Sequence, residues 1–166
     1  RESNQISPDK TAYNTSMAAP PTQRLEKLTE FKALLKDYRP STENIAVLRE
    51  TPLVLLVGPT AAGRNTLINI LVETGRYHYI VSDTTRRPRE NNGVMERDGV
   101  EYWFKAEDDF LTGLQQGTYL EAAVIHEQQV SGISMAELRK ARAQGKIALD
   151  EVEPVGAANV HRYKDR

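Results

Sequence analysis

The apolar positions of the chain change their spacing near residue 52, and this change separates a helical part from an alternating part. In the first part apolar residues recur every three or four positions, which is the spacing of an amphipathic helix. The recurring residues are Leu25, Leu28, Phe31, Leu35 and Tyr38. We expect a helix over 22–38, capped by Thr22 and stopped by Pro40, and a second short helix over 42–50.

The apolar stripe of 22–38 has two interpretations. The simpler one is that the helix packs on the domain that follows it, and the alternative is that it dimerises or binds a partner. Residues 1–21 are rich in Ser, Pro, Ala and Asn and contain no apolar run, so we expect a disordered tail there. The segment 22–50 is then an N-terminal helical extension.

From Pro52 onward, short apolar runs alternate with helical patterns. Strands are expected at 52–58, 77–85, 100–104, 118–125 and 146–152. Helices are expected at 64–75, 106–117, 131–145 and 155–163. Ser134 and Glu137 have the spacing of a capping box at the start of the third of these helices. Strands that alternate with helices predict an α/β domain with a parallel sheet flanked by helices.

A glycine loop joins the first of these strands to a helix, in the stretch GPTAAGRNT over 58–66. Strand, glycine loop and helix are the context of a phosphate-binding loop, because glycines let the backbone wrap an anion and the helix N-terminus presents unpaired N–H groups. The candidate phosphate-binding residues are Gly58, Thr60, Ala61, Ala62, Gly63, Arg64, Asn65 and Thr66. An ordinary strand–turn–helix junction is the alternative, and the loop alone does not decide between them.

Two positions of this loop depart from the pattern G-x-x-x-x-G-K-[ST]. Arg64 stands where the lysine is usual and keeps the charge, but its guanidinium is planar and longer. Asn65 stands where a Mg²⁺-binding hydroxyl is usual and offers only a carbonyl oxygen. Thr66 comes one residue late, which turns it about 100° away on a helix.

A second candidate site lies in the segment SDTTRRPRENNGVMERDGVEYWF, which contains Arg86, Arg87 and Arg89 within four residues. Clustered arginines grip phosphate through charge-assisted, bidentate hydrogen bonds, and Tyr102 can add its hydroxyl. Taken alone, the segment is also compatible with a solvated basic turn or a nucleic-acid patch.

Together these stretches resemble the guanylate kinase family. The order GPTAAG, VSDTTRRPR, DGVEYWF and GTYLEAA matches that family over roughly 52–150. The resemblance implies a P-loop nucleoside monophosphate kinase fold with a small mixed β subdomain for GMP. It implies that Arg86, Arg89 and Tyr102 hold the GMP phosphate and that Ser82 and Glu121 recognise guanine. It also implies that ATP and Mg²⁺ bind.

Within this resemblance, Arg64 and Asp150 are the candidate catalytic residues. Asp150 matches the first acid of the L-D-[IL]-D strand of the family, and Asn65 and Asp150 are candidates to hold Mg²⁺ through water. The second acid of that strand has no clean counterpart, with Glu151 or Glu153 as alternatives. The Y-Y-G-T turn of the family has no tyrosine here, although Gly132 and Ser134 can be aligned with it.

The resemblance also predicts that the domain over 51–166 is incomplete, since the lid with its arginines and a last strand are absent. Two functions remain open. One is phosphoryl transfer from ATP to GMP by a longer protein, and the other is a catalytically weak or inactive module that binds a phosphorylated partner or a nucleotide. Composition argues against nucleic-acid binding, because 22 basic and 23 acidic residues leave a net charge of −1.

Cysteine is absent from the 166 residues, which excludes disulfide and thiolate–metal scaffolds. The sequence has no apolar run as long as the roughly 18 residues of a membrane span, and its N-terminus has no apolar core of a signal peptide. A cytoplasmic location is the expectation that follows.

Overall fold

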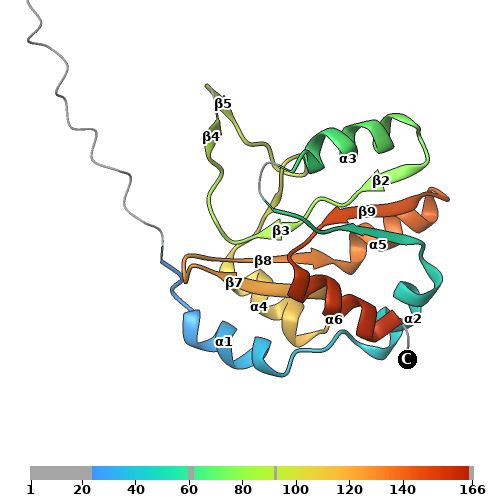
Figure 1. The fold of residues 1–166 in the computed structure, drawn as a ribbon. Helices are drawn as coiled ribbons and strands as arrows, with labels where there is room; N and C mark the ends of the chain where they lie inside the picture. The colour runs from blue at the N-terminus through green and yellow to red at the C-terminus, as the bar shows by residue number, and fades with distance from the viewer. Residues whose placement is uncertain (1–23, 60–61, 92, 165–166) are drawn as a thin grey trace, which may run out of the picture.

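The computed structural model describes residues 24–59, 62–91 and 93–164. The helices are α1 (Leu28–Lys36), α2 (Thr42–Glu50), α3 (Arg64–Glu73), α4 (Glu107–Gln115), α5 (Met135–Ala143) and α6 (Pro154–Lys164). The strands are β1 (Leu53–Leu56), β2 (Tyr77–Tyr79), β3 (Asp83–Thr84), β4 (Glu90–Asn91), β5 (Val94–Met95), β6 (Trp103–Phe104), β7 (Tyr119–Ile125), β8 (Gln129–Ser134) and β9 (Ile147–Glu151). Figure 1 shows their arrangement.

Two sheets form the framework, and they differ in strand direction. The first has the order β1-β9-β2 and is parallel throughout. The second has the order β6-β3-β8-β7 and is mixed, because β3 runs parallel to β6 but antiparallel to β8. The hairpin β4–β5 projects beside them (Figure 1). The expected parallel sheet and small mixed β subdomain are therefore both present.

The central strand β9 sets the position of the charged residues at the end of the parallel sheet. Its register with β1 places Asp150 beside Leu55 and Glu151 beside Leu56. Val152 then donates its backbone N–H to the Leu56 carbonyl at 3.1 Å. The acidic residues after Leu149 therefore lie directly against the loop that leaves β1.

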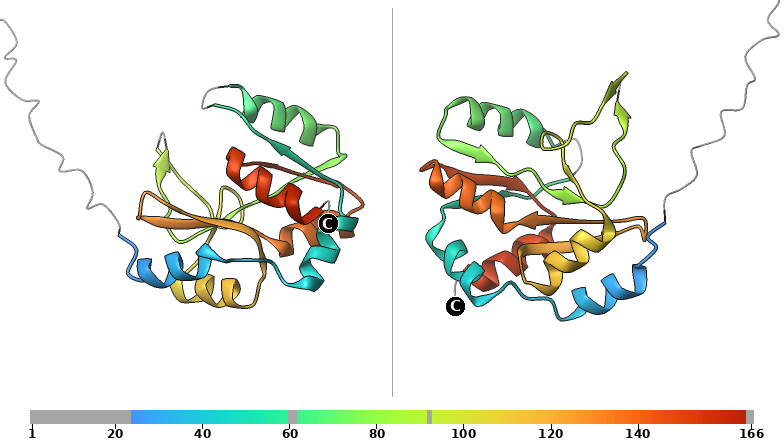
Figure 2. Two further views of the ribbon diagram at one scale, coloured as in Figure 1. Left: turned by 60° about the horizontal axis from the view of Figure 1, so that its bottom comes forward. Right: turned by 180° about the vertical axis from the view of Figure 1, so that it is seen from behind.

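The N-terminal helices are part of the core. The stripe side chain Phe31 is fully buried and meets Phe110 of α4 edge-on, with ring centroids 6.1 Å apart. Tyr38 accepts a hydrogen bond from the Tyr119 backbone N–H and donates one to the Tyr119 carbonyl. Figures 1 and 2 show α1 alongside α4 beneath β7. The stripe thus serves packing within the chain, as in the simpler interpretation.

Three expected elements differ from the structure. The first helix begins at Leu28 rather than at 22, and its expected cap, Thr22, lies outside the described residues. The expected strand over 77–85 is divided between β2 and β3, which belong to different sheets. The expected helix over 131–145 begins only at Met135, because 131–134 complete β8.

The capping box is also only half formed. Ser134 accepts a hydrogen bond from the Ala136 backbone N–H at 3.1 Å. Glu137 instead turns inward, where it bonds to His78 and accepts from Trp103 Nε1 and from the Val81 N–H. A buried carboxylate with three such partners ties α5 to both sheets, and this tertiary role replaces the local one.

In the part of the chain that the structure describes, no helix is both long enough and apolar enough to cross a bilayer.

We predict that Phe31→Ala lowers the free energy of unfolding by about 3–5 kcal/mol, because it removes a large, fully buried ring that packs on Phe110. Urea unfolding of the full-length protein measures this. Lys36→Ala, an exposed change on the same helix, serves as the control and should stay within about 0.5 kcal/mol of wild type. Equal effects of the two changes would show that α1 does not belong to the core.

Candidate functional site

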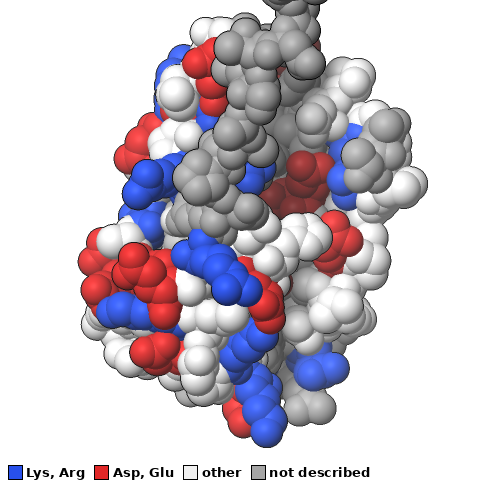
Figure 3. All heavy atoms as spheres, turned by 90° about the vertical axis from the view of Figure 1, so that its left-hand side faces the viewer, with Lys and Arg blue, Asp and Glu red and all other residues white. Residues whose placement is uncertain are grey.

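A cavity of about 380 Å³ opens where the parallel sheet, the hairpin of β7 and β8, and α6 meet. Five residues expected from the sequence line it, although they come from five separate segments. They are Arg64, Ser82, Tyr102, Glu121 and Asp150. Figure 3 shows acidic atoms recessed in a hollow, with basic atoms beside them. The fold thus gathers most of the residues to which the sequence assigned chemistry.

The end of the glycine loop has a backbone conformation that suits an anion site at a helix N-terminus. Gly63 has φ of 79°, a left-handed conformation that favours glycine, and it stands immediately before the first residue of α3. Asn65 and Thr66 are exposed in the first turn of α3. Thr60 and Ala61 lie outside the described residues.

Arg64 points back toward its own loop and toward β9. Its Nη1 donates to the Gly58 carbonyl at 2.6 Å, and its Nε lies 3.1 Å from Glu151 Oε2. The charge that the loop offers to an anion is therefore paired with a carboxylate of the same chain. Of the two candidates for the second acid, Glu151 is therefore the one that contacts the loop, through Arg64.

Glu121 enters the cavity from β7 and packs closely against α6. A Cβ built on Gly156 would lie 3.0 Å from Glu121 Oε2, so glycine at this helical position leaves room for the carboxylate. Burial raises the pKa of Glu121 above its ordinary value. The carboxyl group is held in a confined, poorly hydrated place, where a ligand that donates hydrogen bonds would be recognised strongly.

Asp150 is the most buried acid of the cavity, with 2% of its surface exposed. Its Oδ1 accepts from the Glu151 N–H at 2.7 Å, while its Oδ2 has no hydrogen-bond partner among the described residues. Burial, with added repulsion from Glu121 and Glu151, raises the pKa of Asp150 well above its ordinary value. A buried acceptor without a partner indicates a place for a donor or a cation.

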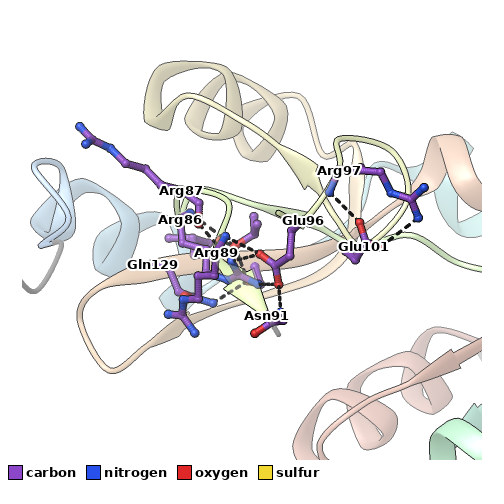
Figure 4. Close-up of polar contacts among 11 residues, drawn as sticks. Arg86, Arg87, Arg89, Asn91, Glu96, Arg97, Glu101 and Gln129 are labelled. Carbon is purple, nitrogen blue, oxygen red and sulfur yellow. Dashed lines mark hydrogen bonds and ion pairs between the residues drawn. The ribbon is translucent and has the colours of Figure 1, made fainter. Parts of the chain in front are cut away.

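Arg86 is held by a carboxylate that the sequence analysis did not single out. Its Nη1 and Nη2 donate to Glu96 Oε2 and Oε1 at 2.5 and 2.8 Å, a bidentate pair in which both side chains are 8% exposed. Figure 4 shows the Glu96 carboxylate facing Arg86, with dashed lines between the two side chains. The Arg86 guanidinium lowers the pKa of Glu96 to about 2, so Glu96 is ionised at every physiological pH.

Arg86 lies next to the cavity through Tyr102. The guanidinium carbon of Arg86 is 4.6 Å from the centre of the Tyr102 ring, and Tyr102 lines the cavity. Arg89 is exposed and contributes its backbone N–H to Glu96 at 2.9 Å. Arg87 extends away from this cluster in Figure 4. Of the residues expected to bind phosphate, Tyr102 therefore lines the cavity, Arg86 adjoins it and is fixed by Glu96, and Arg89 lies at the surface.

The remaining resemblance concerned Gly132 and Ser134, which were aligned with a turn. Both lie in β8, and Gly132 also lines the cavity. A Cβ on Gly132 would approach the Glu121 carbonyl to 2.7 Å, so glycine here permits close pairing of β7 and β8. Both residues therefore belong to a strand, and not to the helix that was expected over 131–145.

Comparison with known proteins agrees with this geometry. The family model described as "Guanylate kinase" matches residues 49–165. This chain belongs to the guanylate kinase family.

Individual guanylate kinases show the extent of the similarity. The chain is 37% identical to the guanylate kinase of Helicobacter pylori (strain ATCC 700392 / 26695) over 105 residues, which cover 63% of this chain and 48% of that protein. It is 40% identical to the Corynebacterium diphtheriae guanylate kinase over 114 residues, which cover 68% and 58%. The chain thus spans about half the length of the curated relatives it matches.

A solved guanylate kinase shares the fold. The crystal structure of guanylate kinase from Anaplasma phagocytophilum matches with a TM-score of 0.50 and 23% identity, covering 78% of this chain and 56% of that one. The α/β architecture of the family is therefore the architecture of this chain.

Sequence reasoning missed two residues of this site, Glu96 and Gly156, and one contact, the pair of Glu151 with Arg64. Glu96 lies in a turn-rich segment with no periodic pattern, so only the chain reversal at the hairpin reveals its pairing with Arg86. Gly156 lies inside a helix, where a glycine usually signals a cost rather than a contact. Glu151 was considered only as a substitute acid, and its pairing with Arg64 depends on the register of β9 with β1.

We predict that Asp150→Asn stabilises the fold. In the unfolded chain the Asp150 carboxyl has a pKa near its ordinary value of 3.8, whereas burial in the fold raises this pKa. The native state therefore binds a proton that the unfolded state releases, and stability falls as pH rises from the unfolded toward the folded pKa. Asparagine removes this dependence, and near pH 7 the free energy of unfolding should rise by on the order of 1 kcal/mol or more.

Urea unfolding at several pH values, without nucleotide or Mg²⁺, measures the effect of Asp150→Asn. Glu153→Gln, a change at an exposed neighbouring acid, is the control and should alter neither the stability nor its pH dependence appreciably. A loss of stability in Asp150→Asn near pH 7 would contradict an uncompensated buried carboxyl.

Proposed function

We propose that the cavity binds GMP and that the longer protein transfers the γ-phosphoryl group of ATP to it. The observation that carries this proposal is the convergence of Ser82, Tyr102, Glu121 and Asp150 on one cavity. These residues come from distant parts of the sequence, and the family resemblance assigns each of them to the acceptor nucleotide or its metal. Membership in the guanylate kinase family supports the same reaction.

The base-recognition half of the proposal rests on Glu121. An ionised carboxylate accepts hydrogen bonds from guanine N1–H and from the exocyclic N2–H, a donor pair that adenine does not present. Because Glu121 is buried against Gly156, a base without these donors would leave it unpaired. Such a penalty gives stronger discrimination than apolar contact does. Ser82 supplies a further polar group at the same wall.

The phosphate half rests on the fixed orientation of Arg86. Glu96 and the Arg87 carbonyl occupy three of its five N–H donors. We assign the remaining donors, with the Arg89 guanidinium and the Tyr102 hydroxyl, to the GMP phosphate. The pair with Glu96 holds the Arg86 guanidinium in one orientation, and the Glu96 carboxylate also cancels part of the Arg86 charge.

The Mg²⁺ that accompanies ATP in this proposal would be held by oxygen groups, which are the ligands that Mg²⁺ prefers. The Oδ2 of Asp150, which has no partner among the described residues, suits a metal-bound water. The side-chain carbonyl oxygen of Asn65 would be a second oxygen group for the ion. In the described part of the chain, no three His, Cys, Asp or Glu residues form a metal-binding group. The ion would therefore depend on ATP phosphates for most of its ligands, where it neutralises charge on the transferring group.

The contacts of Arg64, on the proposed ATP side of the site, favour either a weaker enzyme or a second function. Arg64 pairs with Glu151 and with the Gly58 carbonyl, so ATP phosphates would have to replace these contacts. A non-catalytic module that binds a phosphorylated partner through Arg86 and Arg89 is the candidate that this observation favours. Glu121 opposes that candidate, because a phosphopeptide offers no guanine to recognise.

For GMP binding we predict separate effects of base and phosphate changes. Glu121→Gln replaces one acceptor oxygen with a donor and should weaken GMP binding by about 10- to 100-fold. IMP, which lacks the exocyclic amine, should be affected less. Arg89→Gln should weaken GMP and IMP equally, since both have the same phosphate. Calorimetry on wild type and both variants of the full-length protein measures the six affinities, and wild type that binds neither nucleotide would refute the assignment.

For catalysis we predict that Arg64→Lys raises the rate of ADP release with ATP and GMP by about tenfold or more, because lysine presents a compact charge to the β- and γ-phosphates. Glu151→Gln is the matched variant, since it frees Arg64 without changing it, and it should raise the rate by a smaller factor. A coupled assay on the full-length protein measures both. Absence of turnover in all three proteins, together with phosphopeptide binding, would favour the non-catalytic module.

A further inference from the structure

A second pocket, of about 170 Å³, lies at the junction of the N-terminal helices with α6. Its lining residues come from the α1–α2 connection, from α2 and from the last turn of α6. They are Arg39, Ile45, Arg49, Arg162 and Tyr163. Three of these five residues are arginines, and the pocket shares no lining residue with the GMP cavity.

The arginines of this pocket have no acidic partner among the described residues, whereas several arginines elsewhere do. Among the described residues, five arginines pair with carboxylates, namely Arg64, Arg86, Arg97, Arg139 and Arg142. Within the same residues, none of the three pocket arginines forms an ion pair, and only Arg49 forms a side-chain hydrogen bond. Three guanidinium groups around one small pocket repel one another, and a bound anion would relieve this repulsion.

The acids of α2 do not neutralise the pocket, because they pair with α5. Glu50 lies 2.5 Å from Arg142 Nη2, and Glu43 lies 3.7 Å from Arg139 Nη2. Arg49 is turned the other way, toward α6. The acidic side chains of α2 therefore face α5, whereas its basic side chain Arg49 faces the pocket.

Three hydrogen bonds to backbone carbonyls hold the walls of the pocket in place without pairing its arginines with a carboxylate. Arg49 Nε donates to the Tyr163 carbonyl at 3.3 Å, and the Tyr163 hydroxyl donates to the Tyr38 carbonyl at 3.3 Å. Lys164 Nζ donates to the Thr51 carbonyl at 2.9 Å, which fastens the last turn of α6 to the end of α2. The backbone walls of the pocket are therefore part of the packed junction, while its three arginine side chains are exposed at the rim.

From these contacts we propose that the pocket binds a small phosphate-bearing anion. Guanidinium groups bind phosphate oxygens through parallel N–H donors, and arginine suits this geometry better than lysine does. Ile45 and the Tyr163 ring form the apolar part of the wall, which limits hydration of the bound group. Free inorganic phosphate and the phosphate of a mononucleotide share this chemistry.

The test is a titration of the ¹⁵N-labelled full-length protein with inorganic phosphate, followed by amide NMR. The backbone amides of Ile45, Arg49 and Tyr163 should shift with one saturable dissociation constant. The double variant Arg39→Gln/Arg162→Gln should weaken binding at these amides by about tenfold or more, because it removes two charged donors. Adenosine 5′-monophosphate in place of phosphate distinguishes the sources, since tighter binding would assign the pocket to a nucleotide.

The matched control is Arg24→Gln/Arg76→Gln, which removes two exposed arginines that lie outside the pocket. It has the same change in net charge and should leave binding at these amides unchanged. Equal weakening in the two double variants would reduce the effect to general electrostatics and overturn the proposal. Amide shifts confined to the region of Arg86 and Arg89, or no saturation at the pocket amides, would overturn it as well.

Discussion

The parallel pairing of β9 with β1 and β2 determines where the charged groups of the site lie. Its register puts Asp150 and Glu151 at the end of the sheet, beside the loop that follows β1. Asp150 and Glu151 both line the cavity. Because adjacent residues of a strand point in opposite directions, Asp150 is buried while the more exposed Glu151 reaches Arg64. One backbone arrangement therefore produces both the unpaired acid that suits a cation and the pair that restrains the loop arginine.

The two arginines central to the phosphate sites are each held by a carboxylate, but in different surroundings. The Arg86–Glu96 pair is bidentate and nearly buried, so breaking it would leave an unpaired charge in a poorly hydrated place. The Arg64–Glu151 pair has a single contact and greater exposure, with side chains 22% and 31% exposed. An incoming anion would therefore displace Glu151 from Arg64 more easily than Glu96 from Arg86. If the proposed function holds, the acceptor side around Arg86 would be pre-formed, whereas the ATP side around Arg64 would have to rearrange.

The sequence was sufficient for the features that local patterns encode. The glycine loop, the buried strand at 146–152 and the short helix at 42–50 all follow from spacing and punctuation. The family motifs also named five residues that line one cavity, Arg64, Ser82, Tyr102, Glu121 and Asp150, although Arg86 and Arg89 lie outside its lining. The positions of Glu96 and Gly156 were not predictable, because each matters only through a residue distant in the sequence. The strand β8 was missed for a related reason, since its pattern of small and polar residues becomes a strand only through pairing with β7 and β3.

Helix α6 connects the two anion sites that the structure suggests. Its first half lines the GMP cavity through Val155, Gly156 and Asn159, and its last turn forms a wall of the arginine pocket. The close approach of Glu121 to Gly156 means that α6 cannot shift inward without striking the carboxylate that would recognise guanine. An anion that joins α6 to α2 would therefore also restrict the movement of that wall. By this reasoning α2 supports the cavity wall that α6 forms, whereas the apolar stripe of α1 packs on α4 and β7 in a separate part of the core.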